Sequence, residues 1–375
     1  KELIGTTYDS GDLPILDLVS RQNRPYVHPF IENILPPEDW DLLLPDEGQI
    51  DPTPILQSKY PLLIAFPLSV KDETFGVLLA QDNNVSINRE RRFELLWGIS
   101  QQASLAIQND IINKEINERQ RLEREFHLAR QIQQTFLPDH IPDTPGWQLD
   151  VKWETARQVG GDFYDFFFLP DGRFAFVIAD VSDKGLAASL YMTVTRTLIR
   201  ATAMENLPPA ETLEHVNDLL LANSQTGLFV TTFYGILSIE DGDLDYTIAG
   251  HNPPILIRDN LNDVIEFKRG GTALGALPDI SLANNKINLN YGDCLVLYTD
   301  GVTEAFNTHN EMYSQVRFLQ LLHKLVEKSA SQVIKAVEAD LTKFRQGAPL
   351  SDDTTLLAIY RQPLQANQHG DGGAS

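Results

Sequence analysis

Residues 174–192 read FAFVIADVSDKGLAASLYM, and this stretch decides how most of the chain folds. The run up to Asp180 is almost wholly apolar, which is typical of a buried strand. From Leu186 onward apolar residues recur three and four positions apart, which predicts an apolar-faced helix. Asp180 stands at the strand end, and a turn containing Gly185 follows. Such a position fixes a side chain on a rigid element while leaving its oxygens exposed in a cleft.

The same arrangement recurs at Asp300, where the apolar run CLVLYTDG carries a carboxylate to a strand end. Two further segments carry paired acids, GGDFYD at 160–165 and SDDTT at 351–355. If these segments converge, two bare carboxylates about 4 Å apart repel by roughly 4 kcal/mol at an effective dielectric near 20. Such a cluster persists only when it is protonated or neutralised by cations.

The residue types in this set favour a hard divalent cation. The acids come without clustered histidine and the chain has a single cysteine, so Mg²⁺ or Mn²⁺ is favoured over zinc. Two such ions roughly 3.5–4 Å apart can activate a bridging water and polarise a phosphoryl oxygen, which predicts hydrolysis of a phosphate ester. Asp183 is different, because we expect it to cap the helix that begins near Leu186.

Around these motifs, residues 138–361 mix strand-like and helix-like runs without strict βα alternation. This pattern predicts an α+β fold in two layers or a sandwich. The tail at 362–375 is polar and glycine-rich, and we expect it to be disordered.

The segment before this region, 108–137, is predicted to be one long polar helix that ends at Pro138. Its apolar stripe is too narrow to be buried on a globular core alone, so we favour a parallel dimeric coiled coil. The alternative is a single connecting helix that lies on its own domain. Residues 1–107 contain an apolar hairpin at 62–82, followed by an amphipathic helix.

Composition limits the partners of the chain. Its 375 residues include 52 acidic and 30 basic ones, which gives a formal charge of −22. Such a chain has no electrostatic reason to bind nucleic acid or anionic lipid. No apolar run approaches the roughly 20 residues that span a bilayer, so we expect no membrane association and a cytoplasmic location. Because the chain begins at Lys1, we also expect it to be part of a longer protein.

Residues 138–361 resemble the SpoIIE-like (RsbU-type) branch of the PPM metal-dependent Ser/Thr protein phosphatases. The stretches that carry this resemblance, in the family's order, are VGGDFYD, IADVSDKGLAASLYM, FVTTFYGIL, AGHNPPIL, GTALGAL, LVLYTDGVTEA and SDDTTLLAI. The hairpin LLIAFPLSVKDETFGVLLAQD and the helix after it resemble the second half of a GAF sensor domain, which predicts a partial GAF-like α/β domain over 1–107. The phosphatase resemblance implies two stacked antiparallel sheets, flanked by helices, with metals held between the sheets.

The resemblance also implies a ligand set for two ions, Mn²⁺ or Mg²⁺, in one active site. Asp180 would bridge both ions, and the carbonyl oxygen of Val181 would bind one of them. Asp162 would belong to the coordination shell of the first ion and would contact it largely through water. Asp165 is a further acid that the resemblance places beside this shell.

Asp300 and Asp352 would complete the coordination shell of the second ion. Asp353 competes with Asp352 for this role, because one sequence leaves the register of two adjacent aspartates open. No core acidic position is substituted, so we expect an active enzyme. Asp183, where many relatives carry glycine, adds negative charge but removes no ligand.

Two other residues have alternative roles. Arg157 lies five positions before Asp162 and would either pin the substrate phosphate with a bidentate contact or remain a solvated surface residue. His251, in AGHNPP, would either act as general acid for the leaving oxygen or fix its loop by hydrogen bonding. We favour the loop-fixing role for His251.

The sequence therefore predicts a metal-dependent phosphoserine/phosphothreonine protein phosphatase. The resemblance implies that its substrate is a phosphorylated STAS (anti-anti-sigma) protein. The GAF-like part would sense a small molecule or a protein and signal through a homodimeric helix at 108–137. Two alternatives stay open: a catalytically silent sensor scaffold that only binds its partner, and a hydrolase of small phosphate esters.

Overall fold

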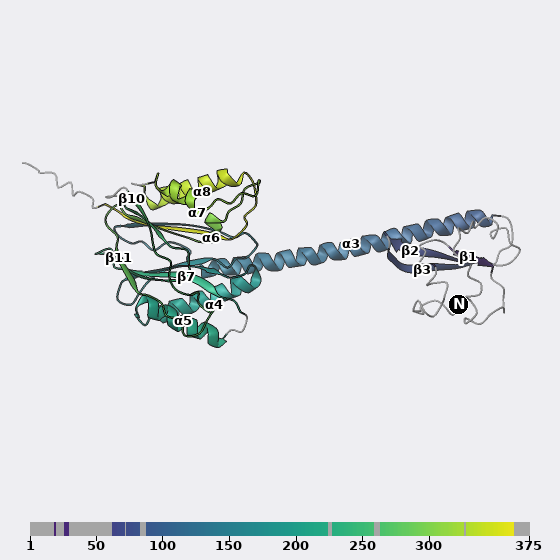
Figure 1. The fold of residues 1–375 in the computed structure, drawn as a ribbon. Coiled ribbons are helices and arrows are strands. Elements are labelled where there is room, and N and C mark those ends of the chain that lie inside the picture. Colours follow the sequence, from purple (N-terminus) through teal and green to yellow (C-terminus); the bar gives the residue numbers. More distant parts are fainter. Residues whose placement is uncertain are drawn as a thin grey trace, which may run out of the picture. The chain divides into compact units, whose positions relative to one another are not determined.

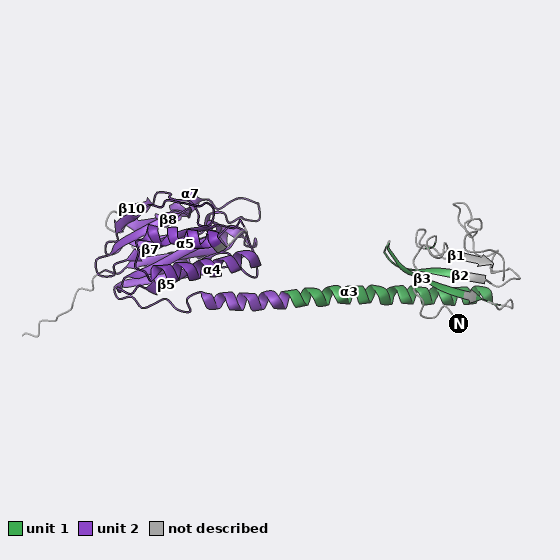
Figure 2. Cartoon of the chain, turned by 90° about the horizontal axis from the view of Figure 1, so that it is seen from below, with its two compact units in different colours: residues 1–122 green, residues 123–375 purple. Residues whose placement is uncertain are grey.

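The structure is a computed structural model that describes residues 19, 26–29, 62–71, 73–82, 88–223, 227–258, 263–325 and 328–363. The chain divides into two compact units, residues 1–122 and residues 123–375 (Figure 2). Most of the predicted disordered tail lies outside the described residues. Within the described ranges, no helix is both long enough and apolar enough to cross a membrane.

The first unit contains the predicted hairpin. Strand β2 (Leu62–Val70) pairs antiparallel with β3 (Glu73–Asp82), and β1 (Tyr26–Pro29) pairs with the other edge of β2. Ile64 and Phe66 of β2 are buried against β3 and against the aromatic residues of the following helix. The rest of a GAF-type fold would fall largely on residues outside the described ranges, so the GAF-like domain stays a prediction.

Helix α3 (Arg89–Phe136) is 48 residues long and continues from the first unit into the second. The sequence predicts two helical segments here, and the structure joins them because no proline or glycine lies between Gly98 and Pro138. Eight of its large apolar side chains are 43–60% exposed in the single chain; they are Leu95, Ile99, Leu105, Ile112, Ile116, Leu122, Leu128 and Ile132.

The second unit is a sandwich of two five-stranded antiparallel sheets (Figure 1). One sheet has the order β11–β8–β7–β6–β5, and these strands are Asn285–Asn288, Asp243–Ala249, Val230–Leu237, Phe174–Val181 and Phe163–Phe168. The other has the order β10–β9–β12–β13–β4, and these are Asp263–Glu266, Ile255–Arg258, Cys294–Tyr298, Thr354–Arg361 and Trp147–Glu154.

Helices cover both outer faces of the sandwich (Figure 1). Helices α4 (Leu186–Ala203) and α5 (Pro209–Asn223) pack on the sheet that contains β6. Helices α7 (Gln315–Leu322) and α8 (Ala330–Arg345), with the short α6 (Asp300–Thr303), lie on the other sheet. The predicted α+β sandwich flanked by helices is therefore confirmed.

Strand β6 is apolar up to Asp180 because both of its faces are buried. Ala175, Val177 and Ala179 face the helices, while the alternate residues, Phe174, Phe176 and Ile178, face the opposite sheet. A strand buried on both faces has no position for a polar side chain until it leaves the core. Asp180 stands at that point.

Candidate metal centre

The first two acidic segments meet at one edge of the β5–β6 pair. The register pairs Phe163 of β5 with Ala179 of β6, so the next residues, Asp162 and Asp180, come side by side. Because Asp162 lies just before β5 and Asp180 near the end of β6, both carboxylates are carried by rigid strands.

The other two acidic segments meet in the opposite sheet. Asp300 follows β12, and residues 352–353 precede β13. These two strands are paired antiparallel, with Tyr298 opposite Leu356. Gly301 is required at this crossing, because a Cβ atom there would lie 1.9 Å from the carbonyl oxygen of Asp353.

Two threonine hydroxyls connect the sheets through Asp162. Thr299 Oγ1 and Thr355 Oγ1 donate to Asp162 Oδ2 at 2.7 and 2.6 Å. Asp162 is only 1% exposed, and burial, followed by the charges of Asp180 and Asp353, raises its pKa well above the ordinary value of 3.8. The sequence analysis did not identify these threonines, because a hydroxyl beside an acidic motif is common in strand sequences.

The pKa values of the neighbouring acids show how closely the carboxylates are packed. Burial, followed by the charge of Asp300, raises the pKa of Asp180 to about 7. Burial, followed by the charge of Asp352, raises the pKa of Asp300 to about 6. The four predicted segments therefore converge, and their negative charge is only partly balanced by protein groups.

Asp352 and Asp353 have different partners in the structure. Asp353 is buried, and its two oxygens accept hydrogen bonds from the backbone N–H groups of Ala156 and Gly161, at 2.8 and 2.7 Å. It holds the loop that precedes Asp162, whereas Asp352 is more exposed and forms an ion pair with Lys184 at 2.7 Å. These contacts favour Asp352 over Asp353 as the residue available to a metal ion.

The loop before Asp162 is also held by helix α3. Gln133 is 3% exposed; its Nε2 donates to the carbonyl of Gly160 at 2.6 Å, and its Oε1 accepts from the Gly160 N–H at 3.2 Å. A Cβ atom at Gly160 would lie 2.2 Å from Asp353 Oδ2, so only glycine fits there. No sequence signal distinguishes Gln133 from the other glutamines of this polar helix.

Asp165 lies apart from the other predicted ligands. It is 1% exposed and forms ion pairs with Arg196 and Arg200 of α4, at 3.0 and 3.1 Å. The reason is the alternation of strand β5, which directs Asp165 to the helix-covered face together with Phe163 and Phe167. The structure therefore does not bring Asp165 to the acidic cluster.

The remaining predicted residues lie near the cluster in different environments. Val181 is buried, and its carbonyl oxygen faces Gly161. Arg157 is exposed, and none of the described ion pairs joins it to an aspartate. His251 is 4% exposed, its Nδ1 lies 2.9 Å from Thr231 Oγ1, and burial lowers its pKa to about 4. A neutral buried imidazole fits the loop-fixing role better than that of a general acid.

The predicted helix cap at Asp183 is wrong. Helix α4 does begin at Leu186, but its N-cap is Gly185, without a side-chain cap hydrogen bond. Asp183 has a left-handed backbone (φ 96) and accepts a hydrogen bond from the N–H of Lys184. Asp183 therefore lies two residues before the N-cap position, and its side chain bonds within the turn instead of capping the helix.

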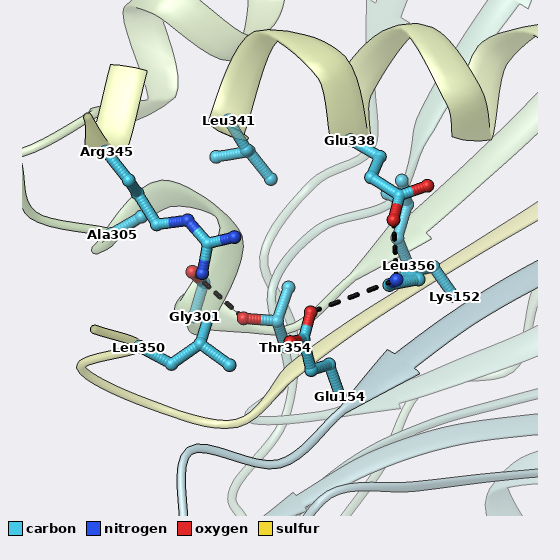
Figure 3. A pocket seen from close by; sticks show the side chains of 10 residues that line it. All are labelled: Lys152, Glu154, Gly301, Ala305, Glu338, Leu341, Arg345, Leu350, Thr354 and Leu356. Carbon is cyan, nitrogen blue, oxygen red and sulfur yellow. Dashed lines mark hydrogen bonds and ion pairs between the residues drawn. The ribbon is translucent and has the colours of Figure 1, made fainter. Parts of the chain in front are cut away.

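The donor set fits a hard divalent cation by its chemistry, because its members are carboxylate oxygens with incompletely balanced charge. Across the described ranges, however, no three carboxylate, imidazole or thiol groups are already arranged to hold a metal ion. The pocket in Figure 3 is a separate feature of about 30 Å³ beside Gly301 and Thr354. None of the aspartates of the acidic segments (Asp162, Asp180, Asp300, Asp352 and Asp353) lines this pocket. Its Lys152 forms an ion pair with Glu338 at 2.5 Å.

The sandwich, its helical layers and the acidic junction between the sheets define a PP2C-like (PPM) fold. The SiaA-PP2C domain of Pseudomonas aeruginosa shares this fold with a TM-score of 0.57 and 20% identity, covering 65% of this chain and 98% of that chain. The RsbU and RsbW domains of Rv1364c from Mycobacterium tuberculosis match with a TM-score of 0.52 and 25% identity, covering 60% of this chain and 63% of that chain.

The family model for Stage II sporulation protein E (SpoIIE) matches residues 170–362, and the chain belongs to this family. Protein IcfG of Synechocystis sp. is 31% identical over 264 residues, which cover 63% of this chain and 41% of IcfG. Phosphoserine phosphatase RsbU of Bacillus subtilis is 27% identical over 243 residues, which cover 65% of this chain and 72% of RsbU. The predicted resemblance to the SpoIIE-like branch is confirmed, although the chain spans less than half the length of IcfG.

Proposed function

We propose that this protein is a Mg²⁺- or Mn²⁺-dependent phosphatase of phosphoserine and phosphothreonine in proteins. The observation that carries the proposal is the convergence of Asp162, Asp180, Asp300 and Asp352, whose charges are only partly balanced. The name of the relative RsbU, a phosphoserine phosphatase, supports the same reaction. A purely structural role would not favour several buried acids that raise each other's pKa.

We propose the ligand set that the family resemblance implies. Asp180 lies centrally and would contact both ions, with the Val181 carbonyl beside it; Asp162 would serve the first ion, and Asp300 and Asp352 the second. When bound, the ions would supply an activated water and polarise a phosphoryl oxygen.

The protein's own residues would fix this geometry. Thr299 and Thr355 orient Asp162, and Asp353 holds the loop before it. We propose that Arg157, being exposed, contacts the substrate phosphate, and that His251 fixes its loop.

We further propose that helix α3 transmits a signal to the site. Its exposed apolar stripe favours a parallel homodimer through residues 108–137, and its last turns reach the Gly160 loop through Gln133. In this proposal the segment at 129–136 has two arrangements, of which one orders the metal site. The partial GAF-like domain would sense a small molecule or a protein partner.

The proposed substrate is a phosphorylated STAS-type protein in the cytoplasm. An enzyme with a formal charge of −22 must recognise a phosphoprotein through the ions and a specific surface, since long-range attraction is unfavourable. The decisive experiment measures phosphate release from p-nitrophenyl phosphate and from a phosphoserine protein, with Mn²⁺ and with EDTA. No metal-dependent release by the wild type, or undiminished release by Asp180→Asn, would refute the proposal. Phosphate release from the small ester alone would favour a hydrolase of small phosphate esters. Binding of the phosphoprotein without phosphate release would favour a catalytically silent scaffold.

A further inference from the structure

Lys184 forms a direct contact with the acidic cluster that the proposed mechanism does not use. Its ammonium nitrogen lies 2.7 Å from Asp352 Oδ2 and donates to the carbonyl of Ser351 at 3.0 Å. The side chains of Lys184 and Asp352 are 38% and 31% exposed, so water and ions can reach the pair. Lys184 is therefore a cation in contact with a residue that we assign to the second metal ion.

The backbone holds Lys184 in place for this contact. The residues on both sides of it have left-handed backbones, with φ 96 at Asp183 and φ 84 at Gly185. The Lys184 N–H donates to Oδ1 of the neighbouring Asp183 at 2.7 Å. Lys184 thereby links the turn after Asp180 to the segment before β13, two of the segments that carry the proposed ligands.

With Lys184 in this position, both oxygens of Asp352 are occupied. Oδ2 accepts from the lysine, and Oδ1 accepts from the N–H of Asp353 at 2.9 Å. This agrees with the finding that no three donor groups among the described residues are arranged to hold a metal ion. A divalent cation that binds Asp352 would lie close to the ammonium group on Oδ2, and two cations close together repel.

We propose that Lys184 is an internal counter-ion that competes with the second divalent cation for Asp352, and so sets the metal affinity of the site. The inference rests on the proposed function only in assuming that this site binds a divalent cation. Binding of the ion would displace the ammonium group from Asp352 into solvent. The half-exposed position and flexible stem of the lysine allow that movement.

The test is the binding of Mn²⁺ to the chain of 375 residues at pH 7.5 and 0.15 M NaCl, measured by isothermal calorimetry without any substrate. Lys184→Met removes the charge and keeps the apolar stem, and we expect it to tighten binding of the second Mn²⁺ ion by about tenfold. Lys184→Arg retains a competing cation and is expected to stay close to the wild type. Lys286→Met is the matched control, because it removes the same charge from an ion pair with Asp243, away from the cluster.

The outcomes separate this inference from the proposed function. Unchanged Mn²⁺ binding in Lys184→Met would overturn the competition. Weaker binding would overturn it too, and would indicate that the lysine positions Asp352 instead. Equal tightening in Lys286→Met would assign the effect to net charge and would overturn the inference too. Absence of Mn²⁺ binding in the wild type would refute both the inference and the proposed function. If Lys184→Met does not fold, Lys184→Gln decides by the same comparison.

Discussion

Asp180→Asn is expected to make the metal-free protein more stable while it abolishes metal-dependent activity. The pKa of Asp180 is about 7 in the folded chain, against an ordinary value of 3.8, because burial and the charge of Asp300 penalise its ionised form. One pKa unit corresponds to about 1.4 kcal/mol, so ionised Asp180 lowers the free energy of unfolding by up to about 4 kcal/mol. Asparagine resembles the protonated form and removes this penalty.

Because folding raises the pKa of Asp180, the stabilising effect of Asp180→Asn depends on pH. A carboxyl whose pKa is raised by folding favours the folded state below pH 4, and this contribution is lost as the pH rises toward 7. The difference in stability between Asp180→Asn and the wild type should thus be small near pH 4 and full above pH 7. For a unit of this size about 2–4 kcal/mol corresponds to a rise in Tm of roughly 5–15 °C.

The assay is thermal unfolding in EDTA at pH 4.5 and pH 8, repeated with Mn²⁺ at pH 8. Mn²⁺ should stabilise the wild type and leave Asp180→Asn nearly unchanged. The difference in stability between the two proteins should therefore become smaller or change sign. Asp171→Asn is the control, since Asp171 is exposed, its pKa is lowered by hydrogen bonds to Arg173, and its replacement should bring no gain. A wild type as stable as Asp180→Asn at pH 8 in EDTA would show that the carboxylates do not repel one another as inferred.

Three further changes test other parts of the structure. Gln133→Ala removes both hydrogen bonds to Gly160 and should lower the free energy of unfolding by about 1–3 kcal/mol. It should also reduce phosphate release. Gln134→Ala, at an exposed position, should change neither quantity. Asp165→Ala removes both carboxylate oxygens that pair with Arg196 and Arg200 and should cost about 3–5 kcal/mol in chemical denaturation. Its Mn²⁺ affinity should stay unchanged, and a large loss of affinity would restore Asp165 as a ligand. The double change Ile112→Asp and Ile116→Asp should convert a dimer to a monomer in light scattering, while Lys114→Ala should not; a dimer that persists would contradict the coiled coil.

The sandwich and the meeting of its acidic segments could be predicted because strong local patterns carry them. Asp180 and Asp300 each follow an apolar strand, and the strand pairing of the fold brings their ends together. Asp165 shows the limit of such reasoning. Its side of the sheet depends on the strand beginning at Phe163, and a shift of one residue would have turned it toward the opposite sheet.

The contacts that no pattern predicted are tertiary. Thr299, Thr355 and Gln133 acquire their roles only because distant segments place a carboxylate or a loop carbonyl against them. Lys184 is similar, since its partner lies 168 positions further along the chain. A polar side chain in a helix or turn looks the same in sequence whether it meets water or a buried partner.

The loop at 156–161 is where these tertiary contacts bring helix α3 and the acidic cluster together. Gln133 holds Gly160 from the helix side, and Asp353 holds the neighbouring Gly161 from the cluster side. Hydrogen bonds from N–H to oxygen have donor–acceptor distances of about 2.7–3.2 Å, so a displacement of the helix end by about an ångström would release Gly160. Because Asp162 is only two residues further on, such a release would remove one of the contacts that fix the backbone before this aspartate. If helix α3 regulates the site as we propose, this loop is the place where it would act.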